Sequence, residues 1–281
     1  MMLGYYPNVL PNRIVAVHFG KFIRTGLAAI IAVNSSIAFA IQPIVRESHH
    51  VRVGNVVETW RLQWLSQPKP VCTPPDPNWT TCPCSGFELG QSGRLELIRL
   101  RRGKEIDRLD LSGYFGGDFP VADGDEAVLP YKPMSETDYM HGEDPMFAAR
   151  MVKRPMVQVM SFDDYDHDGH ETEFVLQTDT EPCGKRYGIL IGISAASPKL
   201  HVFTSVAHPE QPLELPLWYW DKLRGTAGPL HEVTWHCGDH ASDVETELEV
   251  EATPKGFRAV SRSFECDDTG NRGALRDETK L

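Results

Sequence analysis

The strongest constraint on the fold is a strict alternation of side chains between Val244 and Ala252. Glutamates occupy every second position, and the positions between them are Val244, Thr246, Leu248, Val250 and Ala252. A period of two places the two sets on opposite faces of a β-strand. A turn over residues 253–256 implies the cross-strand pairs Ala252 with Phe257, Glu251 with Arg258 and Glu247 with Arg262. This stretch therefore predicts an antiparallel hairpin whose glutamates form a solvated face rather than a catalytic array.

Strand patterns recur along the chain and decide the fold class. Trp60, Leu62 and Trp64 alternate with polar residues, and isoleucines occupy every second position from 189 to 193. Segments 94–100 and 106–111 flank a glycine-containing turn and predict a second hairpin, with a bulge or burial of both faces near residues 97–98. Short helices are expected over residues 144–150 and 216–225, each with proline at its start.

These patterns together predict a mainly β fold. Its antiparallel sheets would resemble a sandwich or a propeller blade, with one or two short helices. No internal repeat is evident, which counts against a complete propeller of similar blades.

Six cysteines follow the N-terminal region: Cys72, Cys82, Cys84, Cys183, Cys237 and Cys266. An even count in an exported chain indicates disulfides, with about 15 pairings open. A zinc site is disfavoured because the Cys82-Pro83-Cys84 spacing is too tight for a zinc knuckle. The preferred pairing joins Cys237 to Cys266, closes the Cys72–Cys84 loop on itself and ties that loop to Cys183.

Residues 1–40 have the features of a signal peptide. Lys21 and Arg24 precede a short apolar core at 26–33, and Ala38-Phe39-Ala40 matches the cleavage pattern. We therefore expect a secreted or periplasmic protein with no stable membrane span after cleavage. The mature chain would be a single mainly β domain over 41–266, divisible into sub-blocks 41–135 and 155–266, followed by a flexible polar tail at 267–281.

An acidic run at residues 163–173 predicts a bound cation. Asp164, Asp166 and Asp168 are spaced two apart, and Gly169 permits the turn that brings the next backbone carbonyl and side chains toward the ion. Oxygen ligands at this density favour Ca²⁺ over zinc or copper. The candidate ligands are Asp164, Asp166, Asp168, His170, Thr172 and Glu173. A solvated acidic turn is the alternative, but closely spaced aspartates repel one another without a counter-ion.

The run resembles the first half of an EF-hand loop. With Asp164 as position 1, Thr172 falls at position 9 and Val175 at position 12, where an EF-hand has glutamate. The flanking segments 156–162 and 174–177 have strand character instead. Strand, D-x-D-x-D-G loop and strand together resemble the calcium loops of FG-GAP and VCBS-type repeats. Those repeats carry aspartate where this chain has Thr172, so Glu173 or Glu171 is the alternative ligand there.

Charge and motif content narrow the function. The formal net charge of −11 disfavours nucleic-acid binding. His231 and His236 are five residues apart, so on a helix they would not share the face that a zinc motif requires. A looser set of His236, Asp239 and His240 is a candidate metal site. We expect an exported, calcium-stabilised binding or structural protein with a protein or carbohydrate partner. The alternative is a secreted metal-dependent hydrolase that uses the region 236–240 or the metal.

Overall fold

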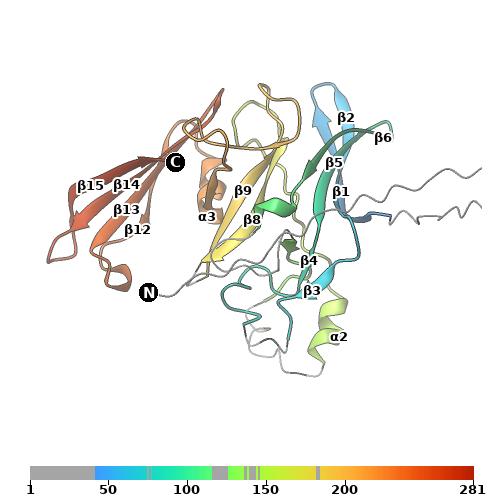
Figure 1. The fold of residues 1–281 in the computed structure, drawn as a ribbon, viewed down its shortest axis with the longest axis horizontal. Coiled ribbons are helices and arrows are strands. Elements are labelled where there is room, and N and C mark those ends of the chain that lie inside the picture. Colours follow the sequence, from blue (N-terminus) through green and yellow to red (C-terminus); the bar gives the residue numbers. More distant parts are fainter. Residues whose placement is uncertain are drawn as a thin grey trace, which may run out of the picture. The chain divides into compact units, whose positions relative to one another are not determined.

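The computed structural model contains three four-stranded antiparallel sheets and a smaller three-stranded one among the residues it describes (Figure 1). Those residues are 42–74, 76, 78–115, 126–135, 138, 144, 146–181 and 184–281. The predicted mainly β class is confirmed, with two short α-helices in the described part of the chain. Residues 41–281 belong to one compact unit. The predicted signal peptide, 1–40, lies outside the described residues.

The first sheet has the strand order β1-β2-β5-β6. Its strands are β1 (Ile44–Val53), β2 (Val56–Trp64), β5 (Leu95–Arg101) and β6 (Lys104–Asp110). Trp60, Leu62 and Trp64 are buried, as their alternation predicts. The β5–β6 hairpin is also confirmed, with a register irregularity between Arg99 and Leu100. All residues of β5 except the last are buried, so both faces of this strand are covered.

A buried ion cluster links β2 and β5, the two central strands of this sheet. The side chain of Glu58 is fully buried and accepts hydrogen bonds from Arg99 Nε (2.8 Å) and Arg101 Nη2 (2.6 Å). Trp60 Nε1 donates to the same carboxylate at 3.2 Å. Burial alone would raise the pKa of Glu58, but these donors outweigh it and lower the pKa. The cluster therefore compensates a charge that would otherwise be costly to bury.

The middle sheet is built around β9. This strand pairs along one edge with β8, and along the other with β10 and β11 in succession. Its strands are β8 (Glu173–Glu181), β9 (Lys185–Gly192), β10 (His201–Val202) and β11 (Glu214–Pro216), and helix α3 (Leu217–Leu223) follows β11 directly. The helix predicted over 216–225 is thus confirmed.

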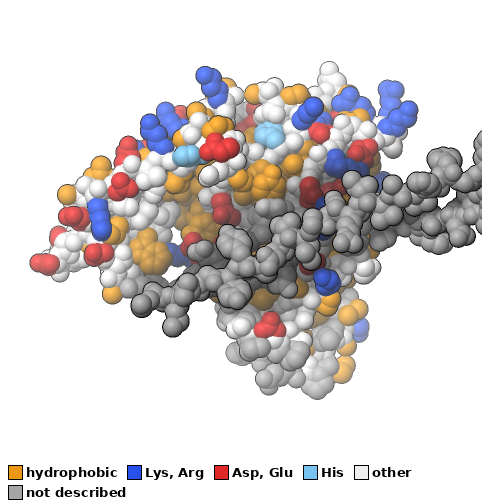
Figure 2. Space-filling view, in the orientation of Figure 1, with side chains coloured by type: hydrophobic (Ala, Val, Ile, Leu, Met, Phe, Trp, Pro, Cys, Tyr) orange, Lys and Arg blue, Asp and Glu red, His pale blue; other side chains and the backbone are white. Residues whose placement is uncertain are grey.

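The C-terminal sheet has the order β12-β13-β14-β15. Its first three strands are β12 (Leu230–Trp235), β13 (Val244–Thr253) and β14 (Gly256–Cys266). The predicted register of the β13–β14 hairpin is confirmed at Ala252 with Phe257, Glu251 with Arg258 and Glu247 with Arg262. Acidic and basic side chains are intermixed over this sheet in Figure 2. The glutamates are therefore one side of a network of ion pairs.

The C-terminal segment corrects the expectation of a flexible tail at 267–281. Residues Arg272–Lys280 form strand β15, which pairs antiparallel with β14. Every residue of β15 is exposed, so the strand carries no apolar alternation that would reveal it in the sequence. Cross-strand ion pairs hold it instead: Arg262 contacts Glu278 at 2.8 Å, and Arg272 contacts Glu247 at 2.8 Å.

Two hydrophobic cores lie on the two faces of the middle sheet. Trp60 and Leu97 of the first sheet share one core with Ile189 and Ile191. On the other face, Leu190 packs with α3 and with the buried residues of the C-terminal sheet. The Trp220 indole donates to the Gly188 carbonyl (2.8 Å), and the Tyr219 hydroxyl donates to the carbonyls of Leu230 (2.6 Å) and Leu248 (3.0 Å). Helix α3 therefore fastens the middle sheet to the C-terminal sheet.

The small sheet and the disulfides organise the proline-rich region. Strands β3 (Lys69–Val71), β4 (Gly90–Gly93) and β7 (Ala127–Leu129) pair in the order β3-β4-β7. The predicted disulfides Cys72–Cys84 and Cys237–Cys266 are both present, with Cα separations of 5.4 Å and 5.6 Å. Cys82 forms no disulfide with another described cysteine, and its Sγ lies 3.3 Å from the Thr180 carbonyl. Its predicted connection to Cys183 falls partly outside the described residues.

Two local expectations need correction. The segment 156–162, expected as a strand, belongs to no strand or ladder. The Glu47 carboxylate accepts from the amides of Val159 (2.8 Å) and Met160 (3.1 Å), so a side chain replaces the neighbouring strand. The helix expected over 144–150 is α2 (Phe147–Val152), which begins later. Asp144 still caps the preceding turn, because its carboxylate accepts from the Met146 amide at 2.8 Å.

Candidate metal centre

The acidic loop is closed at its base by backbone pairing. The Asp163 amide donates to the Glu173 carbonyl (2.9 Å), and the Glu173 amide donates to the Asp163 carbonyl (3.4 Å). Inside the loop, His167 and Gly169 have φ angles of 58° and 90°. This left-handed backbone reverses the chain sharply. The loop therefore folds back over the first residue of β8.

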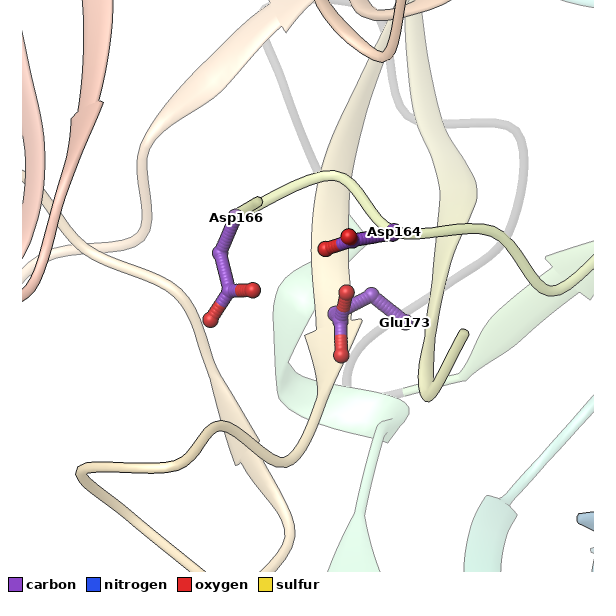
Figure 3. Close-up of side chains that lie close together, drawn as sticks. All are labelled: Asp164, Asp166 and Glu173. Carbon is purple, nitrogen blue, oxygen red and sulfur yellow. The ribbon is translucent and has the colours of Figure 1, made fainter. Parts of the chain in front are cut away.

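Three carboxylates converge at this point. Oxygens of Asp164, Asp166 and Glu173 all lie within 4.8 Å of one another, and in Figure 3 the three groups turn toward one another from the loop and from the start of β8. Glu173 is fully buried, whereas the two aspartates are partly buried. Among the described residues this is the one cluster of three or more such side chains with metal-binding spacing.

Backbone amides hold each carboxylate in place. Asp164 Oδ2 accepts from the Gly169 amide (3.0 Å), Asp166 Oδ1 from the Asp168 amide (3.1 Å), and Glu173 Oε2 from the Tyr165 amide (3.2 Å). Asp164 Oδ1 is different, since it is buried and has no hydrogen-bond partner in the structure. A buried carboxylate oxygen without a donor is costly. A cation among the three carboxylates would supply the missing interaction.

Burial and mutual proximity raise the pKa values of two of these carboxyl groups. Burial raises the pKa of Glu173 to about 9, and the nearby charge of Asp166 adds to this shift. Burial raises the pKa of Asp166 to about 6, with further contributions from the charges of Asp168 and Asp164. Desolvation and like charges both disfavour the ionised forms. Ionisation of all three carboxylates is therefore unfavourable unless a cation compensates their charge.

The other predicted ligands lie around this triad rather than in it. Asp168 accepts from the amides of His170 (2.9 Å) and Ala195 (2.6 Å), so its carboxylate joins the loop to the turn after β9. The His170 side chain is exposed. The Thr172 hydroxyl donates to Glu173 Oε1 at 2.5 Å and also lies 3.1 Å from the Ile193 carbonyl. Thr172 therefore orients Glu173.

Helix α3 supports the loop from outside, which sequence reasoning missed. Arg224 Nη1 lies 3.2 Å from Asp163 Oδ2, and His167 Nε2 lies 3.2 Å from the Leu223 carbonyl. Tyr165, which is buried, meets Trp220 edge to face at 6.3 Å between ring centroids. The helix itself was predictable, but no local pattern connects it to a loop about fifty residues earlier in the chain.

The remaining candidate sites are dispersed or undescribed. His231 and His236 are exposed and lie 3.7 Å and 3.8 Å from Glu249 and Glu245, respectively. Asp239 belongs to a short 3₁₀ turn at Asp239–Ala241, and the His240 side chain lies outside the described residues. These histidines thus contact carboxylates of the C-terminal sheet.

Comparison with known proteins gives no functional lead. The chain matches no family model, and neither a curated protein nor a solved structure matches it significantly. In the described part of the chain, no helix has the length and apolar character needed to cross a membrane. The geometry of the acidic loop is therefore the basis for assigning a function.

Proposed function

We propose that the protein is an exported binding or structural module whose mainly β fold is stabilised by one Ca²⁺ at the acidic loop. The observation that carries this proposal is the convergence of Asp164, Asp166 and Glu173 around a buried, unpartnered carboxylate oxygen of Asp164. The triad contains oxygen donors alone, which suit a hard cation such as Ca²⁺. The resemblance of the loop to FG-GAP and VCBS-type calcium loops supports the same ion.

The ion would act as a structural link. Asp164 and Asp166 belong to the loop, whereas Glu173 begins β8, the edge partner of β9. A cation bound by all three fixes the loop to the middle sheet and offsets the repulsion among the carboxylates. The two disulfides are consistent with an exported protein. Calcium outside the cell is abundant enough to fill a weak site of this kind.

Thermal unfolding with and without Ca²⁺ tests the proposal. Ca²⁺ at about 100 times its Kd should add about 2.7 kcal/mol to the free energy of unfolding. This corresponds to a rise in Tm of about 5–10 °C for a domain of this size. Glu173→Gln should abolish the rise, because it removes the buried ligand charge.

A second measurement locates the ion. Terbium binds calcium sites, and Tyr165 lies in the loop between two of the triad residues, so excitation of this tyrosine should sensitise terbium emission. Competition by Ca²⁺ should remove the emission. Glu171→Gln is the matched control, because Glu171 is exposed and lies outside the triad. An unchanged Tm in Ca²⁺ together with no terbium emission would rule out the site.

A further inference from the structure

A cavity of about 740 Å³ adjoins the acidic loop. Three segments form most of its wall: residues 166–168 of the loop, 194–197 of the turn after β9, and 252–256 at the tip of the β13–β14 hairpin. His201, Phe203 and Thr204 complete the lining. This volume falls within the range of about 300–1,000 Å³ typical of small-molecule sites.

The wall of the cavity is held by hydrogen bonds between segments that are distant in sequence. Asp168 Oδ2 accepts from the Ala195 amide at 2.6 Å, which joins the loop to the turn. The Val206 amide donates to the Phe257 carbonyl at 2.7 Å, which joins the hairpin to the chain after β10. The cavity is therefore formed before any ligand arrives, which lowers the cost of binding.

The cavity reaches the proposed cation through Asp166. This residue is both a member of the triad and part of the cavity wall. Ca²⁺ takes about six to eight oxygen ligands, and one oxygen from each of three carboxylates leaves positions open. Asp166 is the one triad residue that lines the cavity, so a ligand position left open on its side faces the cavity.

The polar groups of the wall suit hydroxyl ligands. His201 Nδ1 lies 2.9 Å from the Lys199 carbonyl, so it carries the hydrogen and leaves Nε2 as an acceptor. Ser197 and Thr204 add hydroxyl groups, and Ala196 and Pro254 add small apolar surfaces. Phe203 is only 3% exposed, so its ring offers no face for stacking. Recognition would thus depend on hydrogen bonds and on the cation.

Charge decides between neutral and anionic ligands. Three carboxylates around a divalent ion leave one negative charge, and Asp168 adds another at the cavity wall. Lys255 is the one lysine or arginine among the lining residues, and it is exposed. An anionic ligand would therefore meet net repulsion, whereas hydroxyl groups coordinate Ca²⁺ without adding charge.

We propose that this cavity binds a neutral saccharide, two adjacent hydroxyls of which complete the coordination of the Ca²⁺ held by Asp164, Asp166 and Glu173. This inference rests on the calcium site proposed above and names its ligand class. The saccharide would bridge the acidic loop and the hairpin tip, so its affinity should depend on both the ion and the volume of the cavity.

The test uses methyl α-mannopyranoside and methyl β-galactopyranoside, which present adjacent hydroxyls in different arrangements. Saturation-transfer NMR measures their binding to the full protein in Ca²⁺ and in EGTA. Europium in place of calcium then reports its bound waters through luminescence decay in H₂O and D₂O. At least one glycoside should bind in Ca²⁺ only and should displace about two waters from europium, one for each hydroxyl oxygen. Its fully O-methylated derivative should not bind.

Ala196→Trp supplies the matching variant, because residue 196 is exposed and a large side chain there fills the cavity without touching the triad. It should weaken glycoside binding by about tenfold or more while the Ca²⁺-dependent rise in Tm persists. Ala274→Trp makes the same change on exposed β15 and should affect neither.

Three results would overturn the inference while leaving the calcium site intact: no glycoside binding despite the rise in Tm, binding that persists in EGTA, or unchanged affinity in Ala196→Trp. A missing rise in Tm would instead refute the calcium site itself.

Discussion

Replacing Asp166 with Asn should have opposite effects on stability with and without Ca²⁺. Without a cation, oxygens of Asp164, Asp166 and Glu173 lie within 4.8 Å of one another, so their ionised forms repel. The Asn side chain has the same shape as Asp and can still accept a hydrogen bond from the Asp168 amide, but it carries no charge. Asp166→Asn should therefore raise Tm in a chelator and abolish the stabilisation by Ca²⁺.

The magnitude follows from the geometry. Two unit charges at 4.8 Å repel by about 3.5 kcal/mol at an effective dielectric constant near 20. Because the pKa of Glu173 is raised to about 9, the charges that act on Asp166 near neutral pH are those of Asp168 and then Asp164. Solvent at the partly exposed loop reduces the effect to about 1–3 kcal/mol, or about 3–10 °C in Tm.

Thermal melts followed by tryptophan fluorescence measure both effects, in EGTA and in Ca²⁺. Glu171→Gln removes the same charge from an exposed side chain of the same loop and should leave both melts nearly unchanged. A lower Tm of Asp166→Asn in EGTA would refute the repulsion argument. A Ca²⁺-dependent rise that survives in Asp166→Asn would show that this carboxylate is not a ligand.

Other predictions concern the stability of the scaffold. Glu58→Gln removes the closer of the two carboxylates that pair with the buried Arg99 guanidinium, leaving Asp107 at 3.3 Å, and should cost about 3 kcal/mol in urea unfolding. Hydrogen bonds from Arg154 and then Ser135 lower the pKa of Asp138 from 3.8 to about 2, so these contacts together should contribute about 2 kcal/mol above pH 4 and lose it as pH falls toward 2. Unfolding curves of Asp138→Asn and the native protein should therefore differ at pH 7 and converge near pH 2. Loss of the Cys237–Cys266 disulfide, which spans 29 residues, should cost about 3–4 kcal/mol if chain entropy dominates; unfolding of the double serine variant measures this.

The parts of the fold that local rules govern were predictable. The β13–β14 register follows from one turn and from the alternation of glutamates, because a slip of one residue would expose Leu248 and Val250. The convergence of two aspartates in the acidic loop was predictable for a similar reason, since Asp164 and Asp166 need only a short spacing and a following glycine to face one point.

The parts that depend on distant partners were not predictable. Asp168 has the spacing of a third ligand, but it lies outside the triad, and its carboxylate accepts from the Ala195 amide, 27 residues later. Strand β15 looked like a flexible tail because its stability comes from the open edge of β14 and from ion pairs rather than from burial. The segment 156–162 has strand composition, but the Glu47 side chain satisfies amides that a neighbouring strand would otherwise pair.

Helix α3 has a consequence for how the protein opens. Its Trp220 donates a hydrogen bond to the middle sheet, and its Tyr219 donates one to the C-terminal sheet. Its last residue contacts His167 of the acidic loop. We therefore expect the loop and the C-terminal sheet to open as one cooperative unit in native-state hydrogen exchange. Amide protection in β13 should rise when Ca²⁺ binds, although this strand supplies none of the triad carboxylates.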